Sequence, residues 1–184
     1  MLSREEALKL VNERLKDEKL VKHVLAVEAI MRNLARHLGE DEELWGLVGL
    51  IHDLDYQETM NSPEIHATKT VEYIQGLVPE TVINAVKAHN YEHTKVQPQT
   101  KLEKGLICSD AISGLVIAAA LVMPTKKLEQ VRVKTLKKKF KDKTFAAATG
   151  RDRIRVCEEI GVPLTDFFKI SLEALQKISE DLGL

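Results

Sequence analysis

The sequence predicts an all-α fold, and three observations support this prediction. Signals that start and stop helices recur along the chain, with Ser or Asp at the expected starts and Gly or Pro at the expected stops. Between these signals, apolar residues recur at steps of three and four, which is the period of one helix face. No segment of useful length alternates as a β-strand does. Because no linker, repeat or low-complexity tract interrupts the pattern, we expect a single domain over residues 1–184.

Three helices are expected before the first histidine-aspartate pair of the chain. Ser3 and Glu6 form a capping box that opens the first helix. The second helix covers residues 20–38 and is stopped by Gly39. Asp41 caps the third helix, which runs into the pair.

Two further helices and a loop are expected in the middle of the chain. Ser62 followed by Pro63 predicts that a fourth helix begins there, with an N-cap and a proline in its first turn. A fifth helix begins at Pro79 and ends near His89. Residues 97–99 then form a loop.

A long sixth helix is expected over residues 102–122, closed by Pro124. Three amphipathic helices follow, marked by Val133, Leu136 and Phe140, then by Ile154, Cys157 and Ile160, and finally by Phe167, Ala174, Leu175, Ile178 and Leu182.

Composition narrows the possible functions. Hydrophobic residues make up 44% of the chain and charged residues 30%, which is typical of a globular protein. The formal net charge of −1 gives no overall attraction to nucleic acid or membrane, and an aromatic content of 4% disfavours a base-stacking surface. We therefore expect no membrane partner, and a nucleic-acid partner is disfavoured.

A reduced, cytoplasmic setting is expected from the cysteines and the N-terminus. Cys108 and Cys157 form neither a zinc-type spacing nor a disulfide framework. The N-terminus carries acidic residues where a signal peptide has an apolar run. The longest apolar stretch, residues 111–123, is interrupted by Ser113 and Gly114 and is too short to span a bilayer, so it predicts a buried helix.

The most informative feature is an ordered set of nitrogen and oxygen donors without sulfur. Its members are His23, His52, Asp53, His66, His89 and Asp110. Six such donors are enough for two metal ions that share a bridging carboxylate. Five predicted helices each contribute one point of contact, which is how metal sites are built in helical bundles.

Each donor also has an ordinary explanation when it is considered alone. His23 fits a core histidine with satisfied hydrogen bonds, and His89 fits a histidine that the dipole favours at a helix C-terminus. Asp110 is more telling, because a carboxylate in its apolar stretch is costly to bury without a cation or hydrogen bonds. Of the two other histidines, His37 is expected to be solvated at a helix end, whereas His93 follows a ligand into a loop and is a candidate catalytic residue that can face the site.

These residues make the chain resemble the HD superfamily of metal-dependent phosphohydrolases. The resemblance covers residues 23–110, about half the chain, and implies an α-helical HD bundle. Mononuclear members need only the first His, the His-Asp pair and the last Asp, so the extra His66 and His89 imply the binuclear branch. The C-terminal stretch is similar to a group of small bacterial and archaeal HD proteins described as predicted hydrolases.

Two departures from the family's patterns narrow the activity. Members that act on cyclic dinucleotides carry a Gly-Tyr-Pro segment after a histidine pair, which this chain lacks. The chain also lacks the Glu-Asp pair that follows the His-Asp motif in alarmone hydrolases. Both activities are therefore disfavoured.

A basic segment at residues 126–143 carries nine Lys or Arg against two acids, a local charge of +7. It is interpreted either as a solvated helix face or as a phosphate-binding wall beside the metals. The candidate phosphate contacts are Lys134, Lys137, Lys138 and Arg151. Lys104, a further candidate in the catalytic set, either binds phosphate or stays solvated, and the second is slightly favoured.

The resulting prediction is a metal-dependent phosphohydrolase that acts on a small phosphorylated molecule, such as a nucleotide. One ion would be held by His23, His52, Asp53 and Asp110, and a second by His66 and His89 with Asp53 as the bridge. The metals would activate water for attack on phosphorus. Mn, Fe, Co, Ni, Zn and Mg all suit one or two such positions. Two alternatives stay open, a diiron oxygenase with the same ligands and a non-catalytic metal-binding or ligand-binding module; the oligomeric state is not predicted.

Overall fold

The computed structural model describes residues 2–184, and every regular element in this range is a helix, as predicted. The longer helices are α1 (Arg4–Arg14), α2 (Glu18–Leu38), α3 (Glu42–Ile51), α6 (Glu80–His89), α8 (Lys101–Leu121), α9 (Val133–Lys141), α10 (Arg151–Glu159) and α11 (Leu164–Lys177). The shorter ones are α4 (Tyr56–Thr59), α5 (Thr68–Ile74), α7 (Tyr91–Thr94), α12 (Ser179–Leu182) and a 3₁₀ turn, η1 (Leu128–Gln130).

The N-terminal helix signals act as the sequence predicts. The Ser3 hydroxyl accepts a hydrogen bond from the Glu6 amide, and the Glu6 carboxylate accepts one from the Ser3 amide, so both halves of the capping box are present. Gly39 ends α2 in the left-handed conformation at φ +70°. The Asp41 carboxylate caps α3 by accepting from two amides of its first turn.

The prediction that a helix begins at Ser62 and Pro63 is wrong. Residues 61–67 form successive turns instead, and α5 begins only at Thr68. Tertiary bonds explain the difference, because the Asn90 amide donates to the carbonyls of Pro63 and His66 and holds the chain in this irregular path. Ala67 then reverses the chain at φ +70° before α5 starts.

Two smaller differences concern short helices. The four-residue helix α4 follows the His-Asp pair and is too short to leave a periodic pattern in the sequence. The last predicted helix is interrupted at Ile178, whose backbone (φ −113°, ψ 21°) leaves the helical region and divides it into α11 and α12.

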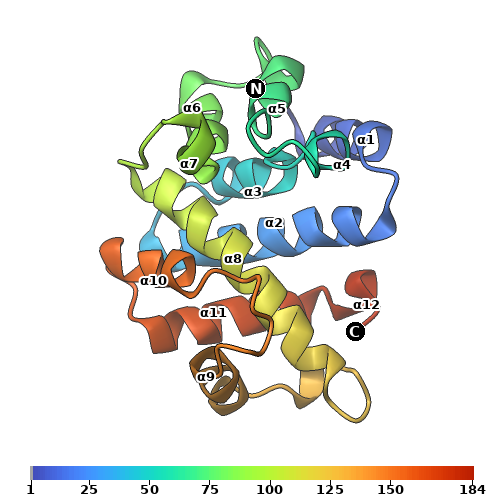
Figure 1. Ribbon diagram of the computed structural model, residues 1–184, viewed down its shortest axis with the longest axis vertical. Coiled ribbons are helices and arrows are strands. Elements are labelled where there is room, and N and C mark those ends of the chain that lie inside the picture. Colours follow the sequence, from blue (N-terminus) through green and yellow to red (C-terminus); the bar gives the residue numbers. More distant parts are fainter. Residues whose placement is uncertain (1) are drawn as a thin grey trace.

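Four long helices form the centre of the bundle. Helix α2 packs against α3, α8 and α11, and α8 crosses in front of both α2 and α11 (Figure 1). Gly49 allows the close approach of α3 to α2, since a Cβ there would lie 2.9 Å from backbone atoms of Glu28. This approach brings the C-terminal end of α3 beside His23 on α2, where the donor residues meet.

Helix α8 runs through the centre of the bundle and carries the donor Asp110. By length and composition alone it is apolar enough to cross a membrane, but 67% of its most apolar window is buried inside the bundle. Most of residues 111–120 are buried, as predicted, whereas Leu121 and Val122 are 49% and 55% exposed and the helix ends at Leu121. Cys108 on α8 and Cys157 on α10 are both buried free thiols.

Candidate metal centre

The six predicted donors converge on one point of the bundle, with Asp53 at its middle. Asp53 Oδ1 lies 3.3 Å from the Nε2 atoms of His52, His66 and His89. Its other oxygen, Oδ2, lies 3.5 Å from His23 Nε2. Asp53 therefore contacts four imidazoles that come from four separate parts of the chain.

Asp110 closes the cluster from α8. Its Oδ1 lies 3.2 Å from His23 Nε2 and 3.9 Å from His52 Nε2. On the opposite side, the Nε2 atoms of His66 and His89 are 2.9 Å apart. Helices α2, α6 and α8 supply His23, His89 and Asp110. The turn that follows α3 supplies His52 and Asp53, and the turns before α5 supply His66.

The end of α3 explains how two neighbouring residues reach the same place. Adjacent residues on a helix point about 100° apart, so a continuing helix would separate His52 from Asp53. Helix α3 ends at Ile51, and His52 is its C-cap. The His52 Nδ1–H then donates to the Gly49 carbonyl over 2.8 Å, which fixes the ring.

His52 provides the strongest sign that a cation belongs in the cluster. Its ring is fully buried, and its Nε2 has no hydrogen-bond partner among the described residues. Burial lowers the pKa of His52 to about 4, so the ring is neutral at neutral pH. Because Nδ1 carries the proton, Nε2 directs its lone pair at the Asp53 carboxylate 3.3 Å away. Two facing lone pairs repel unless a cation lies between them, so the donors fit a metal ion.

His89 repeats this arrangement. Its Nδ1 donates to the Val86 carbonyl, which leaves the Nε2 lone pair for the cluster. A metal-binding histidine commonly has its other ring nitrogen held by a carbonyl or carboxylate in this way. The two carbonyls that fix His52 and His89 each come from three residues earlier in the same helix.

His66 is held by a carboxylate that the sequence analysis missed. Asp55 is fully buried, and its Oδ1 lies 2.8 Å from His66 Nδ1 while its Oδ2 accepts from the Thr70 amide. Asp55 thereby orients His66 towards Asp53, as second carboxylates do in metal proteins. The available signal was its place in the segment His-Asp-Leu-Asp, two residues after Asp53.

Protons and metal ions compete for the same nitrogens in this cluster. Burial lowers the pKa of His23, but hydrogen bonds to Asp110 and Asp53 outweigh it and raise the pKa to about 10. For His66, burial is likewise outweighed by Asp53 and Asp55, and the pKa rises to about 10. Burial raises the pKa of Asp110, but His23 outweighs it and holds the pKa at about 2. The carboxylates therefore stay ionised and attract either protons or a metal.

Five of the six donors form two groups that share one residue, and Asp110 lies beside the first group. His23, His52 and Asp53 form one triad, and Asp53, His66 and His89 form the other. Within each triad, the ligand atoms lie within 4.8 Å of one another. This sharing is what the predicted bridging role of Asp53 requires, while the number of bound ions stays a prediction.

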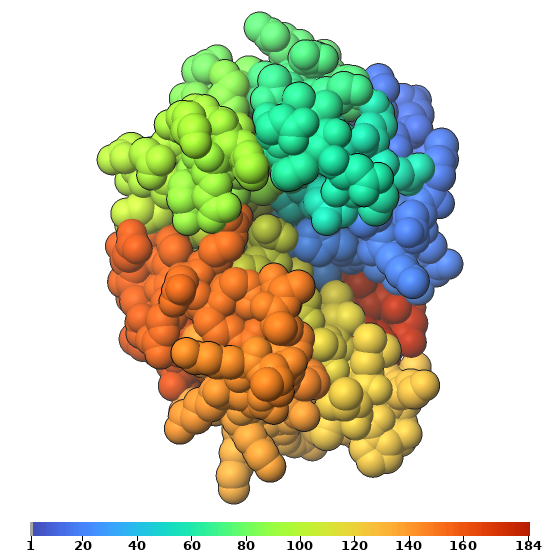
Figure 2. All heavy atoms as spheres, viewed as in Figure 1, coloured from blue at the N-terminus to red at the C-terminus, as the bar shows by residue number. Residues whose placement is uncertain are grey.

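A pocket of about 230 Å³ opens beside the first triad. Its walls include His23, Asp110, Thr149, Gly150 and Arg153. In Figure 2 this face is hollowed at its centre, where α8 is visible between the α9–α10 segment and the upper part of the bundle. The floor carries metal-ligand candidates and the wall carries a cation.

Arg153 is that cation, and the sequence analysis did not single it out. Its Nη2 donates to the His89 carbonyl over 2.5 Å and lies 3.9 Å from Asp110 Oδ2. It stands in the first turn of α10, whose N-terminus also favours anions. No sequence signal separated it from its neighbours Arg151 and Arg155.

Arg151, the arginine that was singled out, has a structural role. Its guanidinium donates to backbone carbonyls of the last turn of α9 and of the segment between α9 and α10, namely those of Lys139, Phe140, Asp142, Phe145, Ala146 and Thr149. These bonds hold the segment together and place Thr149 and Gly150 beside the metal centre. A phosphate contact by Arg151 stays a prediction.

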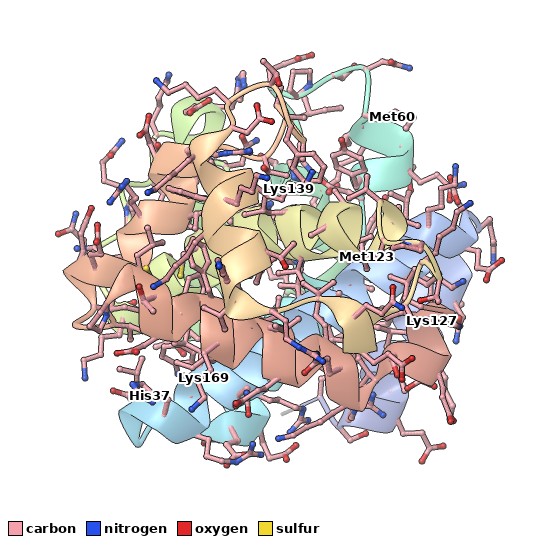
Figure 3. The ribbon with its side chains drawn as sticks, turned by 90° about the horizontal axis from the view of Figure 1, so that it is seen from below. His37, Met60, Met123, Lys127, Lys139 and Lys169 are labelled. Carbon is pink, nitrogen blue, oxygen red and sulfur yellow. The ribbon has the colours of Figure 1, made fainter. Side chains whose placement is uncertain are left out.

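The structure does not bring the remaining candidates to the donor cluster. Lys104 forms an ion pair with Glu159 over 3.0 Å, and His93 is exposed on α7 with no described hydrogen bond to the cluster. The α9 candidates are exposed and do not line the pocket beside the cluster: Lys134, Lys137 and Lys138. His37 is exposed in the last turn of α2, as predicted, and lies at the outer edge of the molecule in Figure 3.

Comparison with known proteins agrees with an all-α bundle built around a His/Asp metal centre. The HD domain family matches residues 20–115, which include all six donors, and the chain belongs to this family. HD domains are typically those of metal-dependent hydrolases.

A ribonuclease Y of Latilactobacillus sakei subsp. sakei (strain 23K) is 30% identical over 142 residues. The match covers 73% of this chain and 26% of the relative, so the chain spans about a quarter of that protein's length. No solved structure matches the chain significantly.

Proposed function

We propose that this protein is a metal-dependent phosphohydrolase that acts on a small phosphorylated molecule. The carrying observation is the buried, unpartnered Nε2 of His52 facing a carboxylate that two donor triads share. His23, His52, Asp53 and Asp110 would hold one divalent ion, and Asp53, His66 and His89 would hold a second. When bound, such ions supply Lewis acidity that makes water nucleophilic and neutralises phosphoryl oxygens.

The chain's own residues keep this cluster ready to bind. Carbonyl bonds fix the tautomers of His52 and His89, and Asp55 fixes the ring of His66. Asp53 presents both of its oxygens to imidazole nitrogens, so it is the residue on which both positions depend. This preorganisation means that binding does not have to order the donors.

The pocket beside the cluster supports a phosphate group as the bound moiety. Arg153 supplies a planar, permanently charged hydrogen-bond donor next to Asp110. This guanidinium could therefore contact a phosphate group bound in the pocket. The neighbouring wall residues Gly114, Ala148 and Gly150 are small and leave room for this group. A volume of about 230 Å³ suits a small molecule or one end of a larger one.

RNA is the second candidate substrate, and the likeness to a ribonuclease Y is the observation that favours it. A phosphodiester would use the same cluster and the same arginine. The two candidates differ in what surrounds the phosphate, since RNA must continue beyond the pocket in both directions.

The deciding experiment is an assay of chelated protein reloaded with Mn²⁺ and tested against nucleotides, phosphate monoesters and a short single-stranded RNA. Release of phosphate or cleavage that needs metal but not O₂ is the expected result, and product formation that consumes O₂ would overturn the proposal. Preference for the RNA would select the second candidate.

Arg153→Gln tests the phosphate contact separately. It should raise KM roughly tenfold at unchanged metal content, because a charged hydrogen bond to the substrate is lost. Arg36→Gln, at an exposed arginine at the far end of α2, is the matched control and should leave KM unchanged.

A further inference from the structure

A second, larger groove lies between α9, α10 and α11, away from the metal centre. Its volume is about 570 Å³, and its walls include Lys137, Lys141, Lys143, Arg155 and Leu164. It shares no lining residue with the pocket beside the donor cluster. Figure 3 looks at the molecule from this end and shows α9 lying across α8 and α11.

The lysines of this groove lack acidic partners in the part of the chain that the structure describes. Lys137, Lys141 and Lys143 take part in no ion pair among the described residues, and Arg155 pairs only with Glu158 on its own helix. Asp152 is the one acid on the described wall. Cations that converge on a groove without compensating acids create a positive potential there, in a chain whose net charge is −1.

The groove also offers apolar and aromatic surface beneath these charges. Phe140 and Phe168 line it with ring centroids 5.4 Å apart, and Leu164 joins them. The Arg155 guanidinium lies 5.4 Å from the centre of the Phe140 ring, which holds it over the groove. A charged rim over an apolar floor suits an organic anion better than an inorganic one, and the volume is that of a small-molecule site.

We propose that this groove binds a small organic molecule that carries two or more phosphate groups. The lysines act as point charges for separate phosphates, and the apolar floor contacts the organic part. A nucleic-acid strand is the weaker occupant, because it needs several exposed rings on which successive bases can stack. Phe140 and Phe168 are at least nine-tenths buried, so they can contact one small group at the bottom of the groove but cannot form such a series.

The groove does not depend on the proposed reaction. It is separated from the pocket at the metal centre by a single segment of the chain. Arg151 and Asp152 line the groove, while Thr149 and Gly150 line the pocket at the metal centre. Because the sites lie on either side of the same segment and share no residue, variants of one can be tested without changing the other.

The test is a binding titration of the full chain with N-methylanthraniloyl-ATP in the presence of EDTA, which removes metal-dependent binding at the donor cluster. The wild-type protein should bind this probe, and the affinity should fall as the salt concentration rises, because the contacts are ionic. Lys137→Gln combined with Lys141→Gln should weaken binding by roughly tenfold or more, since two charged contacts are lost. Lys19→Gln combined with Lys177→Gln, at two exposed lysines on α2 and α11, is the matched control for charge and should bind as wild type does.

Two results would overturn the proposal. One is equal weakening by the control pair, which would show only a nonspecific charge effect. The other is displacement of the probe by a short single-stranded RNA at lower concentration than by ATP, which would make the groove part of a nucleic-acid surface. Arg153→Gln distinguishes the two sites, because it should leave this titration unchanged even if the proposed phosphohydrolase activity fails.

Discussion

The donor cluster and the basic segment both concentrate charge, but they differ in how firmly the backbone places each charged group. In the cluster, His52 and Asp53 have short side chains that start from a helix end and are almost fully buried. In the basic segment, Lys134, Lys137 and Lys138 have long side chains that project into solvent. The backbone thus determines where the His52 and Asp53 side chains lie, whereas the positions of the lysine ammonium groups depend on the rotamers of flexible side chains.

Charge density in a sequence therefore does not by itself locate a site. The cluster has few charges, yet each is fixed by a carbonyl, a carboxylate or a neighbouring ring. The basic segment at residues 126–143 has a local charge of +7, yet its candidates Lys134, Lys137 and Lys138 do not line the pocket beside the cluster. Single changes in the cluster should therefore have large effects on metal binding, whereas changes at the exposed lysines should leave metal binding unaltered.

The largest effect is expected at the shared carboxylate. Asp53→Ala should abolish metal binding and any hydrolysis, because both triads lose their common ligand and the imidazoles are left without a counter-charge. Metal content by elemental analysis and the reloaded activity assay measure this. Asp166→Ala, at an exposed aspartate in the first turn of α11, is the control and should retain both.

Unchanged metal content in Asp53→Ala would refute the assignment of the cluster. Asp53→Asn keeps the size of the side chain and removes only its charge, so it separates loss of the ligand from a packing defect. A thermal unfolding transition in each variant establishes that the protein has folded.

The next effect separates one ion from two. His66→Ala combined with His89→Ala should lower bound metal from about two ions per chain to about one, because only the second triad is removed. The fold should survive, since His66 lies in a turn and His89 at the end of α6. A fully reloaded wild type that never exceeds one ion would contradict the binuclear arrangement.

A smaller effect is expected at Asp55, which orients a ligand without binding metal itself. Asp55→Asn should weaken metal binding at the second position by about 10- to 100-fold, the usual loss when a carboxylate behind a metal-binding histidine is changed. Calorimetric titration with Mn²⁺ should show one affinity lowered and the other unchanged. Equal weakening of both would mean that Asp55 supports the whole cluster and not His66 alone.

The pH dependence of metal binding follows from the raised pKa values of His23 and His66, both about 10. In chelated protein these protons stabilise the fold fully below pH 6.5, the unperturbed histidine pKa, and that stability is lost as pH rises through 10. A metal ion must displace them, so apparent affinity should rise by up to about tenfold per pH unit for each proton released.

Calorimetric titrations of the chelated protein with metal, run in two buffers of different ionisation enthalpy, give the number of protons displaced. About two should be released per chain near neutral pH, one from each raised histidine. The unfolding temperature of chelated protein should fall as pH rises above neutrality, and that of metal-loaded protein should fall less. Metal affinity that is independent of pH would contradict this reading of the cluster.

Most of the fold could be predicted because its signals are local. The capping residues Ser3, Gly39 and Asp41 act within one turn of the helix they open or close, so the sequence around them is sufficient. The false helix start at Pro63 arose because a distant side chain, Asn90, binds the carbonyls of that segment. Tertiary hydrogen bonds of this kind leave no local pattern.

The same distinction between local and tertiary signals applies to the candidate site. The six donors were found because histidine and aspartate are informative residue types and their order was distinctive. Asp55 and Arg153 were missed because their roles depend on contacts across the fold, with His66 and with Asp110. Three arginines lie within five residues at the start of α10, and only the structure shows which one faces the cluster.

The smallest effect is expected at Lys104, a long and flexible cation near the donor cluster in sequence. Lys104 is on the same helix as Asp110, but its Nζ is paired with Glu159 over 3.0 Å. Since Glu159 is more than half exposed, the pair should contribute under about 1 kcal/mol to the free energy of unfolding. Lys104→Met and Glu159→Gln should cost similar amounts, and their combination should cost no more than either, because both remove the same pair. Neither should change KM for a phosphorylated substrate. A raised KM in Lys104→Met alone would mean that this lysine leaves Glu159 to contact phosphate, and a long, flexible cation would then belong to the site after all.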